Sequence, residues 1–330
     1  MTGATCGAIL LRVLGGFMRE RGKVLVVGGH GFIGSNLVRE LLGAGYQVRI
    51  LDLRRESALA DRTETEFLEG DFSNQALARR ALQGTQAVVH LASVTTPQSG
   101  TNDPVHDVTE NLVGTLRLMD ACHETGVRRF VFASSGGTVY GRADRTPMDE
   151  EHPERPLNSY GIVKLATEKY LSLYAMLGRL DPIVLRPANP FGPGQYPLGS
   201  QGAVAVALGC IRDQRPFQLW GDGSVVRDYL FIDDLARAFL AAVEAPQGTP
   251  RVFNIGSGTG RSLSDILEAC RRVTGRPLAV ERLAGRPIDT PVNVLDCARA
   301  RTHLGWAPSV SLEDGLERTW RWILGATRAP

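Results

Sequence analysis

The chain has 330 residues, enough for one large domain or two smaller ones that share a cleft. Apolar residues make up 43% of the chain and charged residues 22%, and the formal net charge of +2 gives no reason to expect nucleic acid or an anionic membrane as a partner. The five cysteines are widely spaced and form no CxxC pair or Cys/His cluster, so neither a zinc site nor a disulfide framework is expected. We therefore predict no bound metal.

The N-terminal stretch does not resemble a targeting signal. Residues 8–17 are apolar, but Arg12 interrupts them and no basic region precedes them, so a signal peptide is not expected. Met18 stands shortly before the first strand, and we expect residues 1–21 to form a disordered extension. No apolar run reaches roughly 18 residues, which excludes a predicted membrane span. A cytoplasmic protein is the resulting expectation.

From residue 23 onward the hydrophobic pattern alternates between strands and helices. Helices are predicted at 32–42, 76–82, 111–125 and 160–178. The predicted strands lie at 23–27, 47–51, 87–91, 129–133 and 182–186. Such alternation predicts an α/β fold with a Rossmann-type, doubly wound parallel sheet covered by helices on both faces.

After residue 186 prolines and glycines become frequent, which predicts a loop-rich segment over the carboxyl edge of the sheet. The later predicted elements are a helix at 231–244, a strand at 251–255, and helices at 262–274 and 312–324. We expect a dinucleotide-binding domain at 22–186, to which residues 228–256 return. A smaller C-terminal substrate-binding domain is expected from residues 187–227 and 257–330.

A glycine-rich turn follows the first predicted strand. Gly28 permits the tight turn, Gly31 leaves room for a diphosphate, and Gly34 lets the following helix pack closely on the strand. The N-terminal N–H groups of that helix favour a bound phosphate. Asp52 stands 18 positions after Gly34, where an acidic residue binds the ribose hydroxyls and repels a 2′-phosphate. The turn therefore predicts a bound dinucleotide, with NAD favoured over NADP.

Two further motifs carry candidate catalytic groups. Tyr160 and Lys164 are four residues apart, so they share one helix face, and a nearby ammonium is expected to lower the pKa of the phenol. Ser134, Ser135 and Thr138 follow the strand at 129–133 and reach the carboxyl edge of the sheet, where ligands bind. One of these hydroxyls can share a substrate proton with Tyr160.

Together these motifs resemble the extended short-chain dehydrogenase/reductase family, in particular its NAD-dependent nucleotide-sugar epimerases related to UDP-glucose 4-epimerase, from Val24 to Trp306. The resemblance implies a retained NAD molecule as cofactor. Its implied cofactor contacts are Gly28, Gly31, Phe32, Ile33, Gly34, Asp52, Asp71, Phe72, Leu91, Ala92, Asn111, Tyr160, Lys164 and Pro187.

The resemblance also implies the substrate contacts. Arg227 and Arg286 are expected to hold the diphosphate of a UDP-sugar, with Asn189 near the sugar and Asp289 beside the second arginine. Asn293 stands where similar epimerases carry a residue that limits the pocket for the 2-substituent. Because Asn293 is smaller than tyrosine, an N-acetyl group is expected to fit.

Two positions depart from the pattern of the family. Gly136 stands where many epimerases carry the serine or threonine that partners the tyrosine, so we assign this role to Thr138, with Ser135 or Ser134 as the alternatives. Related 4,6-dehydratases carry an Asp-Glu pair at the positions of Gly137 and Thr138. The absence of both carboxylates argues against the elimination of water.

The sequence therefore predicts inversion of carbon 4 of a UDP-hexose, either UDP-glucose/galactose or UDP-N-acetylglucosamine/galactosamine, through a transient 4-keto sugar. Alternatives are a UDP-glucuronate 4-epimerase and a nucleotide-sugar reductase, dehydratase or decarboxylase. An NAD-sensing scaffold is the alternative without catalysis, but it has no need of Tyr160 and Lys164. Relatives imply a homodimer formed through the helices predicted at 111–125 and 160–178.

Overall fold

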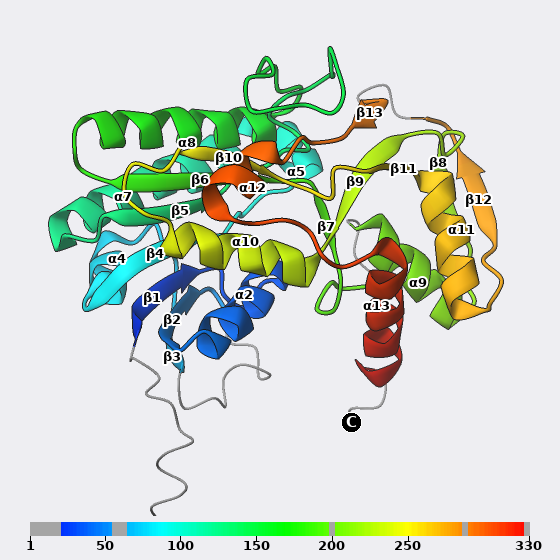
Figure 1. Cartoon of the computed structure of the whole chain (residues 1–330), viewed down its shortest axis with the longest axis horizontal. Coiled ribbons are helices and arrows are strands. Elements are labelled where there is room, and N and C mark those ends of the chain that lie inside the picture. The colour runs from blue at the N-terminus through cyan, green and yellow to red at the C-terminus, as the bar shows by residue number, and fades with distance from the viewer. Residues whose placement is uncertain (1–20, 55–64, 198–201, 286–289, 327–330) are drawn as a thin grey trace, which may run out of the picture.

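The computed structural model describes residues 21–54, 65–197, 202–285 and 290–326, so residues 1–20 of the predicted extension lie outside it. Its largest element is a parallel sheet of seven strands (Figure 1). In the order in which they pair, the strands are β10 (Val252–Ile255), β6 (Asp181–Pro187), β5 (Arg129–Ala133), β4 (Thr85–His90), β1 (Arg21–Val27), β2 (Tyr46–Asp52) and β3 (Thr65–Glu69).

The direction of winding reverses at β1. The chain first proceeds outward through β2 and β3, then returns to β4 on the other side of β1 and continues through β5 and β6. All of these strand pairs are parallel. The predicted Rossmann-type sheet is therefore confirmed. Ligands of such sheets bind outside the carboxyl ends of the strands, where the winding reverses.

Alternate residues of β1 face two different layers of helices, as the two-residue repeat of a strand requires. Val24 and Val26 pack in one apolar cluster with α2 and α10, whereas Leu25 and Val27 pack in another with α4, α7 and α8 (Figure 1). The bounds of these helices are Phe32–Gly43 for α2, Gln75–Leu82 for α4, Gly114–Thr125 for α7, Ser159–Met176 for α8 and Ile232–Glu244 for α10. Burial of β1 on both faces fixes its carboxyl end, which carries the glycine-rich turn.

The helix predicted at 111–125 begins earlier than expected. Two short helices, α5 (Pro97–Asn102) and α6 (Pro104–Asp107), precede a π-helical turn, η1 (Val108–Val113), which continues directly into α7. Each short helix begins with proline, which is tolerated at a first helical position because the N–H there has no partner within the helix. Pro97 and Pro104 thus mark the starts of two helices that the sequence analysis did not predict.

The second half of the chain forms two smaller sheets beside the seven-stranded one. A four-stranded sheet contains β7 (Asn189–Phe191), β9 (Val226–Phe231), β11 (Gly260–Ser262) and β13 (Val292–Asn293). A two-stranded sheet pairs β8 (Phe217–Trp220) with β12 (Val280–Leu283). The accompanying helices are α9 (Ala203–Asp213), α11 (Leu263–Thr274), α12 (Ala298–Leu304) and α13 (Leu312–Ala326).

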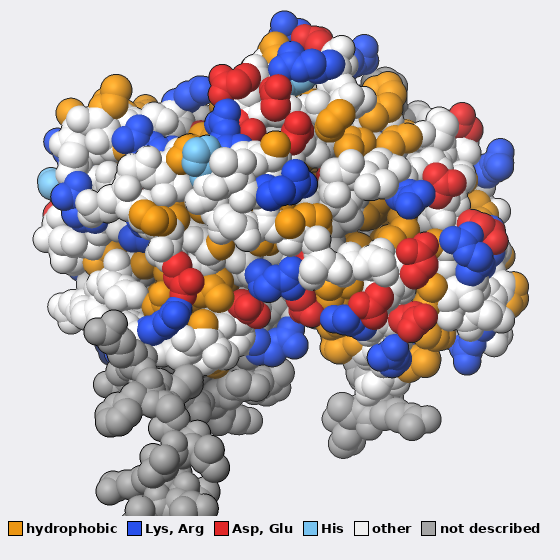
Figure 2. Space-filling model, viewed as in Figure 1, with side chains coloured by type: hydrophobic (Ala, Val, Ile, Leu, Met, Phe, Trp, Pro, Cys, Tyr) orange, Lys and Arg blue, Asp and Glu red, His pale blue; other side chains and the backbone are white. Residues whose placement is uncertain are grey.

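The expectation of a loop-rich segment after residue 186 was only partly right. Prolines and glycines do fill residues 187–197, but the alanine- and valine-rich residues 203–213 form α9, whose apolar side is buried. The division into two domains stays a prediction, although β10 pairs with β6 as a returning segment would. Figure 2 shows acidic and basic side chains intermixed on one face, as the small net charge suggests.

Within the described ranges, none of the helices is both long enough and apolar enough to cross a membrane.

Candidate active site

The glycine-rich turn connects β1 to α2 and leaves space that side chains would fill. Gly28 has a φ of +85°, and a Cβ there would lie 2.8 Å from the backbone N of Ala92. A Cβ on Gly34 would overlap the carbonyl oxygen of Gly28. Gly31 precedes α2 in an extended conformation, and no side chain caps the helix N-terminus. The free N–H groups of α2 can therefore bind an anion such as a diphosphate.

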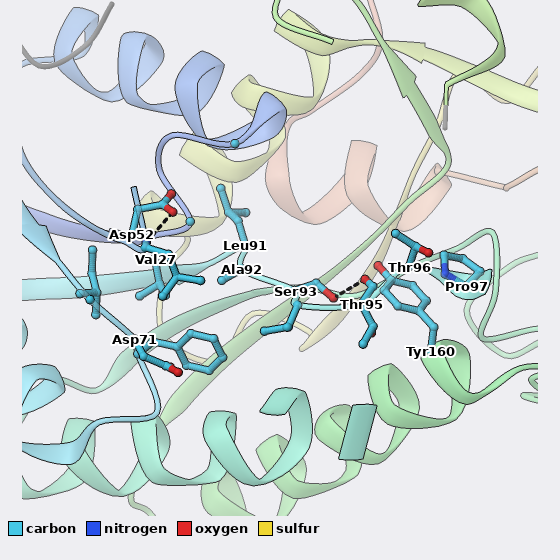
Figure 3. A pocket seen from close by; sticks show the side chains of 17 residues that line it. Val27, Asp52, Asp71, Leu91, Ala92, Ser93, Thr95, Thr96, Pro97 and Tyr160 are labelled. Carbon is cyan, nitrogen blue, oxygen red and sulfur yellow. Dashed lines mark hydrogen bonds between the residues drawn. The ribbon is translucent and has the colours of Figure 1, made fainter. Parts of the chain in front are cut away.

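A cavity of about 400 Å³ lies along this turn. Figure 3 shows Asp52 and Asp71 at one end of it and Tyr160 at the other. Asp52 lies at the end of β2, and its Oδ2 accepts a hydrogen bond of 2.9 Å from the backbone N–H of His30 within the turn. Its other oxygen accepts a hydrogen bond from the backbone N–H of Leu53, so the carboxylate is held in the cavity wall, and its contact with the cofactor ribose stays a prediction.

Most predicted cofactor residues lie in the walls of this cavity or of its neighbour. Those in the first cavity are Gly28, Gly31, Asp52, Asp71, Phe72, Leu91, Ala92 and Tyr160. Those in the second are Phe32, Ile33, Leu91, Tyr160, Lys164 and Pro187. Gly34 lies behind the cavity wall, where its missing side chain lets α2 pack closely on the turn at Gly28. Asn111 also lies behind it: its side chain accepts from Val94 N–H at 2.9 Å and donates to Thr95 at 2.9 Å.

The loop that follows β4 is a part of the cavity that the sequence reasoning did not single out. Ser93, Val94, Thr95, Thr96 and Pro97 all line the first cavity. Figure 3 shows Thr95, Thr96 and Pro97 beside the Tyr160 ring. The position of this loop at the carboxyl end of a central parallel strand was the signal that could have found it.

Tyr160 and Lys164 lie on α8, as their spacing predicted. The Lys164 ammonium lies 5.4 Å from the centre of the Tyr160 ring, is 5% exposed, and donates a hydrogen bond of 2.9 Å to the carbonyl oxygen of Ala133. Burial lowers the pKa of Lys164 to about 8, against the opposite effects of Asp107 and Glu168. The ammonium is thus held beside Tyr160 in the wall of the second cavity.

The expected lowering of the Tyr160 pKa is wrong. Burial, and then the negative charge of Asp107, raise the pKa of Tyr160 to about 12. The Lys164 ammonium, by contrast, donates its hydrogen bond to the carbonyl oxygen of Ala133. The described protein alone therefore favours the phenol of Tyr160 over the phenolate.

The loop after β5 carries the three candidate hydroxyl partners of Tyr160. A Cβ on Gly136 would lie 2.5 Å from Leu295 and 2.9 Å from the carbonyl oxygen of Arg186, so this position holds no side chain. The Ser134 hydroxyl donates to the Glu168 carboxylate. The Thr138 hydroxyl is buried in the cavity wall and has no hydrogen-bond partner within the described protein.

Buried hydroxyls are normally paired, and Thr138 lines the second cavity, so its role as the hydroxyl partner of Tyr160 stays the prediction. Ser135 also lines the second cavity, and it stays the alternative.

The second cavity, of about 620 Å³, adjoins the first through Leu91, Pro97 and Tyr160. Asn189 and Arg227 line it. The Asn189 amide donates to the carbonyl oxygen of Asp228 at 3.3 Å, and the Arg227 guanidinium donates to that of Thr290 at 2.7 Å. These bonds come from β7 and β9, which pair side by side.

The remaining predicted substrate residues are not found in this wall. Arg286 and Asp289 lie outside the described residues, and their roles stay predictions. Asn293 is fully buried, donates a hydrogen bond of 3.0 Å to the carbonyl oxygen of Gly136, and is absent from the lining of the second cavity. The described geometry therefore gives no support to its predicted contact with the sugar.

The cleft combines a dinucleotide-binding turn, an acidic residue at the end of β2, and a tyrosine–lysine pair where the two cavities meet. These features define an enzyme that binds a nicotinamide dinucleotide beside a second substrate. The family model described as NAD dependent epimerase/dehydratase family matches residues 24–256. The chain belongs to this family, and its cofactor is NAD.

Relatives and solved structures agree with this assignment. The UDP-glucose 4-epimerase of Mycolicibacterium smegmatis is 37% identical over 304 residues, which cover 90% of this chain and 97% of the relative. The UDP-glucose 4-epimerase of Thermotoga maritima, solved with UDP-glucose, is 33% identical with a TM-score of 0.87, covering 93% of this chain and 100% of that chain. The enzyme of Thermus thermophilus, solved with NAD, is 34% identical with a TM-score of 0.85, covering 92% of this chain and 99% of that chain. The predicted resemblance to nucleotide-sugar epimerases is thus confirmed.

Proposed function

We propose that this chain inverts carbon 4 of a UDP-linked hexose and returns its cofactor unchanged. The observation that carries the proposal is the meeting of Tyr160, Lys164 and the unpaired Thr138 hydroxyl in one wall. No acid–base carboxylate stands at Gly137 or Thr138, which disfavours dehydration. The relatives named above, all called UDP-glucose 4-epimerase, support the same reaction.

The residues of the chain divide the work between binding and proton transfer. The glycine-rich turn and the N-terminus of α2 bind the diphosphate of the cofactor, and Asp52 binds its adenosine ribose. When bound, oxidised NAD supplies a hydride acceptor and a positive charge, which lowers the pKa of a neighbouring phenol. Tyr160 takes the proton of the 4-hydroxyl group and later returns it, while Thr138 holds that hydroxyl group in place.

The identity of the sugar is the finer part of the proposal. We assign UDP-glucose/galactose as one substrate pair and UDP-N-acetylglucosamine/galactosamine as a second. The second cavity has a volume of about 620 Å³ and is lined in part by small residues such as Gly137 and Ala188, which leave room for an N-acetyl group. Turnover of UDP-galactose, UDP-N-acetylgalactosamine and UDP-galacturonate by the purified enzyme tests this order. Fast turnover of the galacturonate alone would instead identify a UDP-glucuronate 4-epimerase.

Net redox chemistry is the alternative that absorbance distinguishes. An epimerase regenerates its cofactor in every cycle, so the nicotinamide absorbance stays constant while the sugar is converted. A reductase or decarboxylase consumes or accumulates reduced cofactor in proportion to product. A steady change in this absorbance with any UDP-hexose would therefore contradict the proposal.

We also propose that the enzyme is a cytoplasmic homodimer that pairs through α7 and α8. Apolar side chains stand exposed along α8, with Ile162 54% and Met176 76% accessible. Leu171 of the same helix belongs to the core, so the exposed set lies on the opposite side. Light scattering after size exclusion measures the mass directly, and Met176→Glu is expected to shift a dimer toward monomer.

A further inference from the structure

A buried carboxylate lies beside the tyrosine–lysine pair and has no role assigned so far. Asp107, the last residue of α6, is 0% exposed. Its Oδ1 accepts hydrogen bonds from the Thr95 hydroxyl at 2.7 Å and the Asn111 amide at 2.8 Å. Its Oδ2 accepts one from the Ser159 hydroxyl at 2.7 Å. A carboxylate is the side chain able to accept from all three donors at once.

These hydrogen bonds join the two chain segments that carry the site. Ser159 begins α8 and directly precedes Tyr160. Thr95 belongs to the loop that lines the first cavity beside the Tyr160 ring (Figure 3). Backbone packing closes the arrangement, because a Cβ on Gly100 would lie 2.5 Å from the Asp107 carboxylate. The π-helical turn η1 begins directly after Asp107 and ends beyond Asn111. The Asp107 carboxylate is therefore enclosed by its three hydrogen-bond donors and by the backbone at Gly100.

The charged surroundings of Asp107 are unusually simple. In the described ranges, no lysine or arginine forms an ion pair with it. The ionisable groups that face it from α8 are Tyr160 and Lys164. Helix α5 and residues 93–96 carry no ionisable side chain, and the neighbours on its own stretch are Asp103, His106 and Glu110. A buried carboxylate without an ion-pair partner costs free energy of folding, which points to a functional role for Asp107.

We propose that Asp107 is a positioning residue for catalysis: it holds Tyr160 in place through Ser159 and Thr95, and it places a fixed negative charge near the phenol. The proposal rests on the proposed function for its kinetic part, but its electrostatic part concerns the chain alone. Negative charge from Asp107 raises the pKa of Tyr160 and also opposes the effect of burial on the pKa of Lys164, so it favours the phenol and the ammonium together.

Titration of the phenol tests the electrostatic part. Asp107→Asn keeps the shape and the capacity for three hydrogen bonds, since the hydroxyl of Ser159 can accept from the new amide, but it removes the charge. The purified enzyme with bound NAD is titrated by the ultraviolet absorbance of phenolate, and subtraction of a Tyr160→Phe counterpart in each background isolates Tyr160. We expect its step to move to lower pH by about one pH unit in Asp107→Asn.

A second variant separates position from charge. Ser159→Ala removes one hydrogen bond and leaves the carboxylate, so the Tyr160 step stays in place while kcat falls about tenfold with KM unchanged. Glu110→Gln is the matched control, because it removes one charge from η1 outside the buried cluster and should alter neither step nor kcat. The proposal would be overturned if the titration step of Tyr160 stays at the same pH in folded Asp107→Asn, or if kcat is unchanged in Ser159→Ala.

Failure of the proposed function looks different. If the wild-type enzyme converts no UDP-hexose, the rates disappear in every variant, but the phenolate step and its dependence on Asp107 are still measured.

Discussion

The two adjoining cavities are built in different ways. The first is lined almost entirely by residues 27–97, with Tyr160 as the one contribution from further along the described chain. The second collects side chains from α2, the β5 loop, α8, β7, α9, β9 and α11, which span residues 32–263. The first depends on backbone geometry and space, and the second depends on particular side chains. A local stretch of sequence can specify the first, whereas only the completed fold assembles the second.

Loss of the Tyr160 phenol should distinguish most clearly between catalysis and cofactor binding. Tyr160→Phe removes the group that carries the proton and leaves the glycine-rich turn that binds the cofactor unchanged. We therefore expect kcat to fall about a thousandfold or more. Bound NAD, released by denaturation and quantified, should match the wild-type amount. Conversion of a UDP-hexose is followed by separating the two epimers. Activity within tenfold of the wild type would remove Tyr160 from the mechanism.

A side chain in the glycine-rich turn should produce the opposite pattern. Gly34→Val places atoms against the carbonyl oxygen of Gly28, so the helix must move away from β1 and the diphosphate site is lost. We expect purified protein with little or no NAD and correspondingly little activity. Gly43→Ala lies in the same helix with open space around it and should retain both. A full content of NAD in purified Gly34→Val would show that the glycine-rich turn does not bind the cofactor.

The sequence was a good guide where chemistry and local order coincide. The glycine-rich turn, Asp52 and the Tyr160–Lys164 spacing each lie within one strand–helix unit, and the fold places them as predicted. Asn293 shows the limit, because its distance from the sugar depends on how β13 pairs with β9 and on contact with Gly136, which is 157 positions away. Asp107 was overlooked for the same reason, since its partner Ser159 is 52 positions away along the chain.

The unpaired hydroxyl of Thr138 permits a test in which activity and stability move in different directions. Thr138→Val keeps the shape and removes a buried polar group that has no partner in the described protein, so the free energy of unfolding should not fall. The hydrogen bond to the substrate is lost, and kcat should fall about tenfold. Thr138→Ser restores the hydroxyl and should recover most of this rate.

Chemical unfolding and epimer separation give the two measurements. Unchanged kcat in Thr138→Val would transfer the role to Ser135, and the matching Ser135→Ala variant would then lose activity.

The last expected effect concerns the stability cost of the buried Lys164 ammonium and needs no substrate. Below a pH of about 8 this lysine is protonated in both the folded and the unfolded chain, and the folded protein bears the full cost of a buried ammonium. Because the folded pKa is about 8 and the ordinary value 10.5, the unfolded chain binds the extra proton between these limits, so stability rises with pH there. Relative to Lys164→Met, the wild type without cofactor should gain about 3 kcal/mol of unfolding free energy across this window. Lys169→Met, an exposed lysine of the same helix, serves as the control, and a flat difference for Lys164→Met would show that the ammonium is not buried in solution.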